Sequence, residues 1–155
     1  MKKIGIVTLL IIFSIGICFA QSKTYSKNGI GFEYNKGSKI SDFAGMPTIA
    51  YNGNYLIIQI TGDGDFDDEL FEIFLKSTKK VVEEKGYLFL SETTDKTING
   101  INTKSFDVKY SPKEYERKFI GIKNGYLITL TIKCKSEKTI NSDFATVLNS
   151  IRFEL

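Results

Sequence analysis

The segment from Tyr115 to Cys134 has the clearest pattern of apolar and polar positions in the chain. Apolar residues recur at every second position on both sides of Asn124 and Gly125. This alternation is typical of strands, and an Asn-Gly dipeptide favours the positive φ angles of a type I′ hairpin turn. The pattern therefore predicts a two-residue hairpin in which Tyr115 pairs with Cys134.

The two sides of this predicted hairpin differ in polarity. We call the side that carries Tyr115 and Cys134 the first side and the opposite side, which carries Glu116 and Lys133, the second side. The second side is apolar near the turn and polar farther away, where Glu116 faces Lys133 as a favourable cross-strand pair. We expect the first side to face the main core beneath a mid-chain helix, with Phe74 of that helix meeting Ile128 and Leu130. The apolar residues of the first side are Tyr115, Phe119, Ile128, Leu130, Ile132 and Cys134.

A long helix is predicted from Asp67 to Lys85 because apolar residues recur there at intervals of three and four. Acidic residues at its start complement the positive end of the helix dipole, and Gly86 is placed to cap its C-terminus. This helix is long enough to cross a sheet. Its apolar stripe consists of Leu70, Phe71, Phe74, Thr78, Val81 and Val82.

A second, C-terminal helix is predicted by the same spacing. Asn141 or Ser142 is placed to cap its start, and Ile151 to Phe153 is expected to be extended again. The residues that carry the helical spacing are Ile140, Phe144, Val147, Leu148 and Ile151.

The N-terminal half of the chain reads as short strands. Gly29 to Ser41 predicts two of them around a turn, and Ile49–Tyr51 and Tyr55–Thr61 predict two more around an Asn-Gly turn. Asp42–Pro47 lacks periodicity and is predicted to be a loop.

Leu88–Ile98 and Ile101–Tyr110 predict a further hairpin, because an Asn-Gly dipeptide lies between them. A two-residue turn would pair Asp95 with Lys104, which is favourable. The same register would also set two acidic side chains, at positions 92 and 107, against each other, which is unfavourable. We therefore expect a bulge or divergence there.

The first 20 residues have the pattern of a secretory signal peptide. Lys2 and Lys3 precede the apolar run Ile4–Phe19, which ends at the small residue Ala20. Cleavage there would leave Gln21 as the first residue of a protein exported to the periplasm or the extracellular space. An uncleaved or lipidated anchor is the alternative interpretation of the same run.

Composition narrows the function classes for the remaining domain, residues 21–155. Removing 20 of the 155 residues leaves 135, the size of one domain, and lowers the net charge from +3 to +1 because two lysines leave. This balance gives no argument for nucleic-acid binding, and it favours at most a peripheral contact with a membrane. The chain has no histidine, so Cys134 has no histidine to activate it, and we interpret it as a buried strand cysteine.

An acidic loop resembles a calcium site only in part. Asp63, Asp65 and Asp67 stand two residues apart, as at the start of an EF-hand loop. However, the glycine position of that pattern holds Asp68, and the closing glutamate position holds Phe74. We therefore expect no metal and no other cofactor, and we interpret the loop as the N-terminal cap of the long helix.

Several short motifs follow one another in a recognisable order along the chain. They are Gly31–Gly37 (GFEYNKG), Thr97–Gly100 (TING), Gly125–Leu130 (GYLITL) and Val147–Phe153 (VLNSIRF). With the long helix between the first two, this order resembles the PsbP-like superfamily. That group includes the extrinsic PsbP subunit of photosystem II, bacterial DcrB-like envelope proteins and a eukaryotic Ran-binding import factor.

The resemblance covers nearly all of residues 21–155, with departures at Asn35 and Ser38, where members often have proline and tryptophan. It implies an α+β fold with a single antiparallel β-sheet flanked by helices, in an α/β/α-type sandwich. It also implies a non-catalytic binding or accessory role in the bacterial cell envelope, and it passes on no catalytic residues.

The functional prediction is therefore a binding protein, not an enzyme, with an unknown protein partner. A carrier of a small apolar ligand between sheet and helix is the alternative, and carboxylate chemistry on the acidic loop is the one enzymatic route left. Exposed aromatics on loops are typical of partner surfaces. The predicted site consists of Phe43 and Tyr51, and the acidic loop with Asp63, Asp65 and Phe66 forms its charged rim. Phe66 has a second interpretation, in which it packs onto the helix as a hydrophobic staple.

Overall fold

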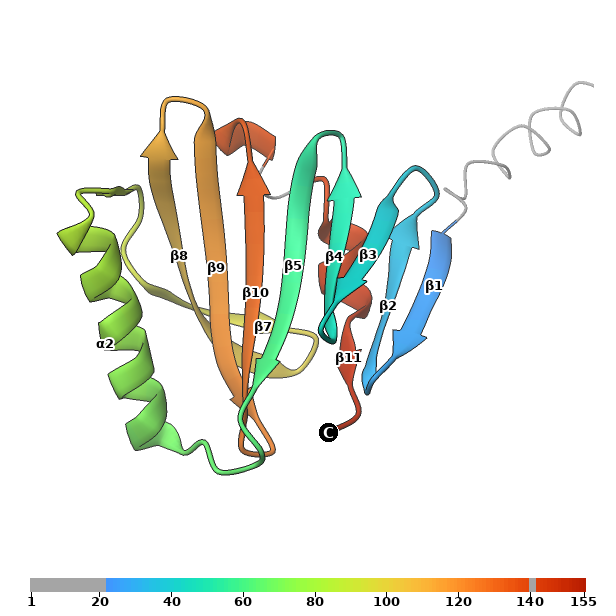
Figure 1. Ribbon diagram of the computed structural model, residues 1–155, viewed down its shortest axis with the longest axis horizontal. Helices are drawn as coiled ribbons and strands as arrows, with labels where there is room; N and C mark the ends of the chain where they lie inside the picture. Colours follow the sequence, from blue (N-terminus) through green and yellow to red (C-terminus); the bar gives the residue numbers. More distant parts are fainter. Residues whose placement is uncertain (1–21, 140–141) are drawn as a thin grey trace, which may run out of the picture.

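The computed structural model describes residues 22–139 and 142–155, which form antiparallel sheets and helices in layers (Figure 1). The predicted signal peptide, residues 1–20, lies outside the described residues. Ile140 and Asn141, with which we expected the second helix to begin, lie outside them as well.

A three-stranded sheet has the order β1-β2-β11, with β1 at Ser22–Lys27, β2 at Ile30–Asn35 and β11 at Arg152–Phe153. An eight-stranded sheet has the order β3-β4-β5-β10-β9-β8-β6, and β7 also pairs with β8. Its strands are β3 (Lys39–Phe43), β4 (Met46–Tyr51), β5 (Asn54–Thr61), β6 (Leu88–Phe89), β7 (Thr94–Ile98), β8 (Ile101–Ser111), β9 (Glu114–Lys123) and β10 (Tyr126–Cys134). The helices are α2 (Asp68–Glu84), the 3-10 turn η1 (Glu137–Thr139) and α3 (Ala145–Ser150).

The prediction of a single sheet is wrong, although the α+β class and the antiparallel arrangement are confirmed. The segment Ser22–Lys27 is polar and carries no apolar alternation, yet it forms β1 and pairs with β2 along its whole length. On its other edge β2 pairs with β11 at Ile30 and Gly31, and β2 does not join β3. The stacking of Tyr25 on Phe32, with ring centroids 4.7 Å apart, holds β1 in place.

The β9–β10 hairpin has the register that the sequence predicts. Tyr115 pairs with Cys134, and the pairing continues without a break to the turn at Asn124 and Gly125. Both turn residues have positive φ angles, 52° and 77°, as a type I′ turn requires. The hairpin lies in the middle of the eight-stranded sheet, between β5 and β8.

The prediction of a loop at Asp42–Pro47 is wrong, because these residues belong to a hairpin. Asp42 pairs with Pro47 and Phe43 with Met46, so that β3 and β4 are joined by Ala44 and Gly45 alone. Ala44 takes a φ of 52°, which L-residues other than asparagine and aspartate rarely adopt. The turn escaped prediction because alanine stands where the other tight turns of this type have asparagine.

The expected divergence near Glu92 is confirmed. Residues 90–93 belong to no strand, and Leu88–Ile98 is therefore split into β6 and β7, which pair with the same strand, β8. The favourable pair of Asp95 and Lys104 forms, with the two charged groups 2.7 Å apart.

The main core lies between the inner face of the eight-stranded sheet and a layer made of α3 and the three-stranded sheet. Apolar side chains from every part of this layer meet the predicted first side of the β9–β10 hairpin. The buried members include Phe32, Ile49, Leu56, Ile58, Phe119, Ile128, Leu130, Ile132, Phe144, Val147 and Ile151. The Val147–Phe153 segment therefore closes the core from the side opposite α2.

A second, smaller cluster lies under α2 on the outer face of the same sheet. Leu75 and Val82 of the helix pack with sheet residues Phe106, Val108, Ile120 and Leu127. The prediction that Phe74 meets Ile128 and Leu130 is therefore wrong: α2 covers the other side of the β9–β10 hairpin. The reason is that the apolar end of that second side, together with β8, offers α2 its own apolar surface.

The ends of α2 agree with the sequence. Asp67 is the N-cap, and its Oδ1 accepts a hydrogen bond from the backbone N–H of Leu70 at 2.9 Å. At the other end, Gly86 has a φ of 69° and its N–H bonds to the carbonyl of Glu83, while the N–H of Tyr87 bonds to that of Val82. This pair of bonds is a Schellman motif. None of the described helices is both long and apolar enough to cross a membrane.

Candidate functional site

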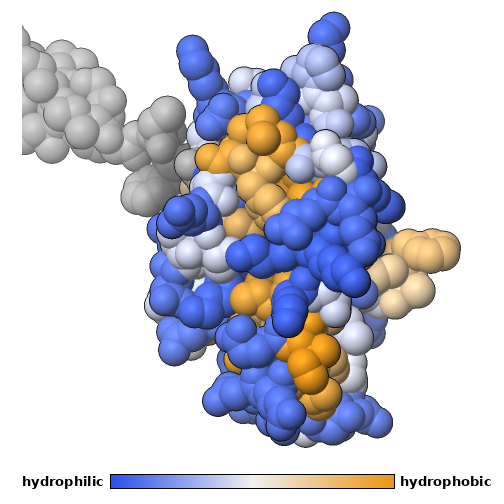
Figure 2. Space-filling view, turned by 90° about the vertical axis from the view of Figure 1, so that its left-hand side faces the viewer, coloured by the Kyte–Doolittle hydropathy of each residue, from blue (hydrophilic) through white to orange (hydrophobic). Residues whose placement is uncertain are grey.

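The outer face of the eight-stranded sheet is covered at one end only. In Figure 1, α2 lies beside β8, while β5, β4 and β3 continue away from it. The outward side chains Tyr55 and Phe43 on these strands remain 47% and 78% exposed. Figure 2 shows the side that carries α2, where hydrophobic surface remains visible between hydrophilic residues. A wide part of this face is thus available to a ligand or partner.

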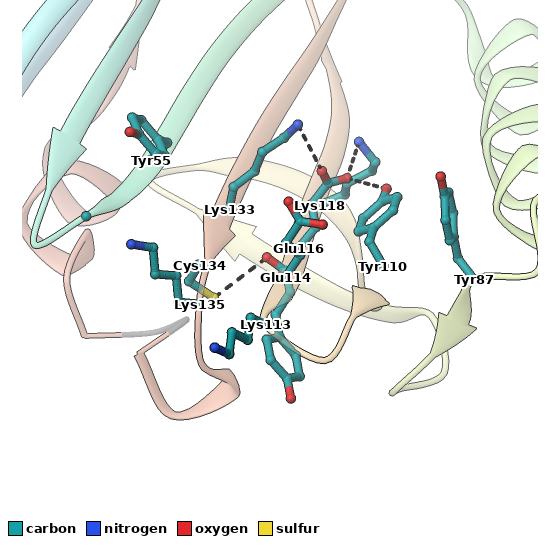
Figure 3. Close-up of a pocket in the computed structure, with 12 residues that line it drawn as sticks. Tyr55, Tyr87, Tyr110, Lys113, Glu114, Glu116, Lys118, Lys133, Cys134 and Lys135 are labelled. Atoms are coloured by element: carbon teal, nitrogen blue, oxygen red, sulfur yellow. Dashed lines mark hydrogen bonds and ion pairs between the residues drawn. The ribbon is translucent and has the colours of Figure 1, made fainter.

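A hollow of about 600 Å³ opens on this face, between the C-terminal end of α2 and the sheet (Figure 3). We call it the tyrosine–lysine hollow. Besides Gly53, Tyr115 and Cys134, the residues that line it are Tyr55, Tyr87, Tyr110, Lys113, Glu114, Glu116, Lys118, Lys133 and Lys135.

Strand register brings the centre of the hollow together. Lys133 on β10 pairs with Tyr55 on β5 and with Glu116 on β9, so the three side chains stand in one row across neighbouring strands. They point to the outer face because Cys134 and Tyr115, their neighbours in sequence, pack against the inner core. The predicted pairing of Glu116 with Lys133 is therefore confirmed, with 3.7 Å between the Nζ and Oε2 atoms.

Glu116 is only 4% exposed, so its carboxylate needs compensation. Tyr110 Oη donates a hydrogen bond to Glu116 Oε1 at 2.8 Å, and Lys118 Nζ lies 2.7 Å from the same oxygen. These two short contacts and the nearby Lys133 compensate the buried carboxylate at the floor of the hollow.

The two tyrosines of the wall are set by local structure. Tyr87 is placed by the Schellman motif that ends α2, and Tyr110 lies at the irregularity between Lys109 and Ser111 in the pairing of β8 with β9. Their rings meet edge to face at 4.4 Å. Burial raises the pKa of Tyr110 well above its ordinary value, and the charge of Glu116 adds to this effect, so Tyr110 remains a hydrogen-bond donor at neutral pH.

Exposed lysines form the rim of the hollow. Lys113 and Lys135 are both exposed, and the backbone N–H of Lys135 is held by the side chain of the buried Asn54 at 3.2 Å. Four lysines and two glutamates line the hollow, so its charge at neutral pH is positive. The hollow can therefore attract an anion while offering hydroxyl groups and aromatic surface.

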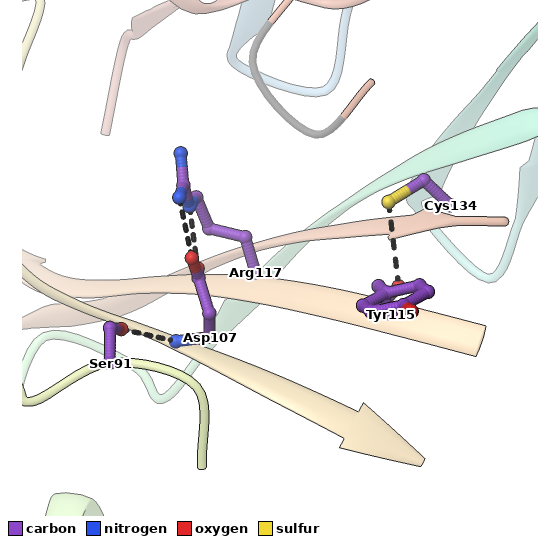
Figure 4. Close-up of polar contacts among 5 residues, drawn as sticks. All are labelled: Ser91, Asp107, Tyr115, Arg117 and Cys134. Carbon is purple, nitrogen blue, oxygen red and sulfur yellow. Dashed lines mark hydrogen bonds and ion pairs between the residues drawn. The ribbon is translucent and has the colours of Figure 1, made fainter. Parts of the chain in front are cut away.

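Cys134 is a poor candidate for chemistry in this hollow. The residue is 5% exposed, and its thiol points to the carbonyl of Tyr115 at 3.8 Å on the inner side of the sheet (Figure 4). Burial raises its pKa, which keeps it in the thiol form that is a weak nucleophile. Within residues 22–139 and 142–155, no group of three or more cysteine or acidic side chains could hold a metal ion.

A second buried ion pair lies on the inner side of the sheet and is structural. Arg117 Nε and Nη2 donate to the two carboxylate oxygens of Asp107 at 2.6 and 2.5 Å (Figure 4). The backbone N–H of Asp107 donates to Ser91 Oγ at 3.0 Å, which ties the irregular segment after β6 to the sheet. The hydrogen bonds to Asp107 raise the pKa of Arg117.

The structure separates the two aromatics predicted as a partner surface. Phe43 projects from the outer face at the end of β3, whereas Tyr51 is half-buried and packs against the inner core. A single flat partner cannot contact both side chains from one face of the β3–β4 hairpin. Their role in binding remains a prediction, and only Phe43 lies on the same face as the tyrosine–lysine hollow.

The acidic loop lies at the other end of α2. Asp63 and Asp65 are exposed there, and their part in a binding surface stays a prediction. Phe66 precedes the N-cap and packs against the cluster under α2, as Phe71 does, which agrees with its interpretation as a staple. Its backbone N–H also donates to the carbonyl of Gly125 at 2.8 Å.

Sequence reasoning missed most of the hollow. The signal that was present is the polar stretch on the second side of the β9–β10 hairpin, where Glu116, Lys118 and Lys133 follow apolar positions. Tyr55 and Tyr110 come from strands whose position beside this hairpin depends on sheet order, which no local pattern specifies.

The comparisons with known proteins concern the fold. No protein-family model matches the chain, and no curated protein sequence matches it. The chain is similar to the solution structure of cyanobacterial PsbP from Synechocystis sp. PCC 6803, with a TM-score of 0.60 and 17% identity over 89% of this chain and 95% of that chain. A crystal structure from Bacteroides thetaiotaomicron VPI-5482 matches with a TM-score of 0.64 and 9% identity, over 87% of this chain and 49% of that chain.

At these identities the likeness shows the fold alone. The resemblance to PsbP-like proteins that the motif order indicates is therefore confirmed at the level of the fold. The residues of the tyrosine–lysine hollow have to be argued from their own geometry.

Proposed function

We propose that this protein is an exported, non-catalytic binding protein of the cell envelope whose ligand occupies the tyrosine–lysine hollow. The observation that carries the proposal is the hollow itself, at about 600 Å³, on a sheet face that α2 leaves open. This volume lies within the range of about 300–1,000 Å³ found for ligand sites. Export is proposed from the basic and apolar pattern of residues 1–20.

The non-catalytic part of the proposal rests on chemistry. The chain has no histidine, and the floor carboxylate of Glu116 is already engaged by Tyr110 and Lys118. Histidine is the side chain that most often acts as a general acid or base, and the carboxylate of Glu116 serves to hold Tyr110 and Lys118 at the floor of the hollow. The fold shared with cyanobacterial PsbP adds an analogy in the same direction.

The alternative of a carrier for a small apolar ligand fits the hollow less well. An apolar molecule placed there would cover the ammonium group of Lys133 and the Oε2 atom of Glu116 without a hydrogen bond to either, which is costly. The lining therefore favours a polar or charged ligand. Phe43, on the same face, is proposed as an additional contact for a macromolecular ligand, with the acidic loop of Asp63 and Asp65 as a separate charged surface.

Site-specific photo-crosslinking in the native envelope tests the proposal. A photoreactive phenylalanine in place of Tyr55 is expected to give a discrete crosslinked species, because this side chain lines the hollow and is 47% exposed. The same group in place of Lys23, exposed on β1 of the other sheet, is the matched control. Adding Lys133→Ala should weaken the Tyr55 crosslink. A crosslink from position 23 alone, or from neither position, would refute the site.

A further inference from the structure

The hollow offers three kinds of recognition at once, and together they define a ligand class. It has cationic groups on its rim, an anionic hydrogen-bond acceptor at its floor and aromatic faces on its walls. The following argument rests on the proposed function, because it takes the hollow to be a binding site.

The rim lysines retain binding capacity after the internal ion pairs are satisfied. Lys118 is engaged with Glu116 at 2.7 Å, and its side chain is 19% exposed. Lys133 is 3.7 Å from Glu116, outside hydrogen-bond distance, and its side chain is 55% exposed. Lys113 and Lys135 add two exposed ammonium groups. A ligand that carries carboxylate or similar acidic groups would pair with these three lysines.

The carboxylate of Glu116 at the floor of the hollow can accept a hydrogen bond from a ligand. Both short contacts of Glu116, from Tyr110 and Lys118, go to Oε1, whereas among the described residues Oε2 has the longer contact to Lys133 alone. A carboxylate has about four acceptor positions, so Oε2 can accept a hydrogen bond from a ligand. A purely anionic ligand would be repelled there, but a hydroxyl group would be bound.

The walls supply flat apolar surface. Tyr55 is 47% exposed, and Tyr87 presents its ring beside Tyr110. Tyrosine combines a hydrophobic ring with a polar end, which suits ligands that have both apolar C–H faces and hydroxyl groups. Acidic groups, hydroxyl donors and C–H faces occur together in sugar acids and their oligomers.

We infer that the tyrosine–lysine hollow binds an acidic saccharide. Its carboxylates pair with Lys113, Lys133 and Lys135, one of its hydroxyl groups donates to Glu116, and its C–H face lies on Tyr55. An acidic peptide would satisfy the lysines alone, and a lipid headgroup would add acyl chains for which the rim has no apolar channel.

The test is a titration of the purified protein with trigalacturonic acid. Binding is measured by calorimetry and by the chemical-shift changes of backbone amides. Neutral maltotriose lacks the acidic groups, and hexaglutamate lacks the hydroxyl groups. We expect trigalacturonic acid to bind at least about tenfold more tightly than either, with shifts confined to the residues that line the hollow and their neighbours in sequence. Binding should weaken from 50 to 200 mM salt, as ion pairs with exposed lysines are screened.

Variants assign the contacts. Lys133→Ala and Tyr55→Ala change exposed residues and should each weaken binding by about fivefold or more, while Lys23→Ala on β1 should leave it unchanged. Glu116→Gln replaces the floor charge and should weaken binding of the saccharide more than that of hexaglutamate. The melting temperature of each variant shows whether it is folded, and Lys133→Ala and Tyr55→Ala decide between the outcomes if Glu116→Gln does not fold.

Other outcomes overturn the inference. Equal binding of hexaglutamate would show recognition of charge alone, and binding only to phosphatidylglycerol vesicles would assign the site to a lipid surface. If no probe binds while the Tyr55 crosslink forms in the envelope, the saccharide inference fails and the proposed function stands. If the crosslink is absent too, both fail.

Discussion

Two buried carboxylates on adjacent strands illustrate the balance of forces at the residue scale. Asp107 on β8 pairs with Arg117 on the inner side of the sheet, and Glu116 on β9 pairs with Tyr110 and Lys118 on the outer side. Because a buried charge is costly, each carboxylate persists only through its partners. Removing one partner alone leaves the carboxylate buried without compensation. The resulting loss in the free energy of unfolding is therefore larger than the net contribution of the intact pair.

Arg117→Ala is expected to destabilise the protein by about 3–5 kcal/mol, because it leaves the carboxylate of Asp107 buried without its bidentate partner. Urea unfolding measures this change in the free energy of unfolding. The double variant Asp107→Val with Arg117→Met removes both charges and should recover much of the loss. A cost below about 0.5 kcal/mol would mean that solvent replaces the arginine.

Tyr110 gives a pH dependence with a defined sign. Its pKa is raised in the folded protein above the ordinary value of 10.0, mainly by burial and also by Glu116. The stabilisation linked to the protonated phenol is therefore complete below about pH 10 and is lost as the pH rises above it. Urea unfolding between pH 8 and 11 should show a steeper loss of stability in the wild type than in Tyr110→Phe. Parallel curves would contradict the assignment.

At the element scale, tight turns determine which strands pair. The dipeptides at positions 44–45 and 124–125 both have paired positive φ angles, although only the second has the Asn-Gly sequence. The turn at Gly125 is constrained further, because a Cβ atom there would collide with the backbone of Gly64 in the acidic loop. The β9–β10 turn thus positions the segment that leads into α2.

Ala44→Asn is expected to stabilise the β3–β4 hairpin by about 1 kcal/mol, because asparagine tolerates the left-handed φ of 52° better than alanine. Thermal or urea unfolding measures the gain. Gly45→Ala is the matched control and should destabilise, since it places a side chain at a φ of 78°. A loss of stability in Ala44→Asn would favour the loop that the sequence indicated.

At the scale of the whole molecule, the eight-stranded sheet separates two apolar clusters. Leu130 belongs to the inner core with α3, and Leu75 belongs to the outer cluster under α2. Leu130→Ala and Leu75→Ala are each expected to cost about 2–5 kcal/mol. Because the residues share no cluster, the double variant should equal their sum within about 0.5 kcal/mol in urea unfolding. A strong coupling would place α2 on the inner face after all.

Export is a further prediction for the whole chain. Mass spectrometry of the secreted or envelope fraction should find Gln21 as the first residue of the mature protein, because cleavage is expected after Ala20. A mature pool that still begins at Met1 would support the anchor instead. A lipid-sized mass increase on Cys18 would identify the lipidated form.

The candidate site shows how far local patterns reach. The pairing of Glu116 with Lys133 followed from counting outward from Asn124 and Gly125, and the structure has it. The tyrosines that complete the hollow did not follow, because Tyr55 and Tyr110 lie on strands whose neighbours are decided by the order of the whole sheet.

The sequence by itself determined the elements whose causes are local. Alternation and Asn-Gly turns specified the register of β9 with β10, and helical spacing with Asp67 and Gly86 at its ends specified α2. These features depend on backbone angles, capping and side-chain period, which act within a few residues of each other.

Only the tertiary structure decided which face each apolar surface covers. Apolar burial is not directional, so α2 could have packed on either side of the β9–β10 hairpin. Because α3 and the three-stranded sheet cover the inner side, α2 packs on the outer side. The same holds for the polar strand β1, whose own residues carry no strand signal and which forms through pairing with β2. The tyrosine–lysine hollow exists because α2 covers one end of a sheet that is wider than the helix.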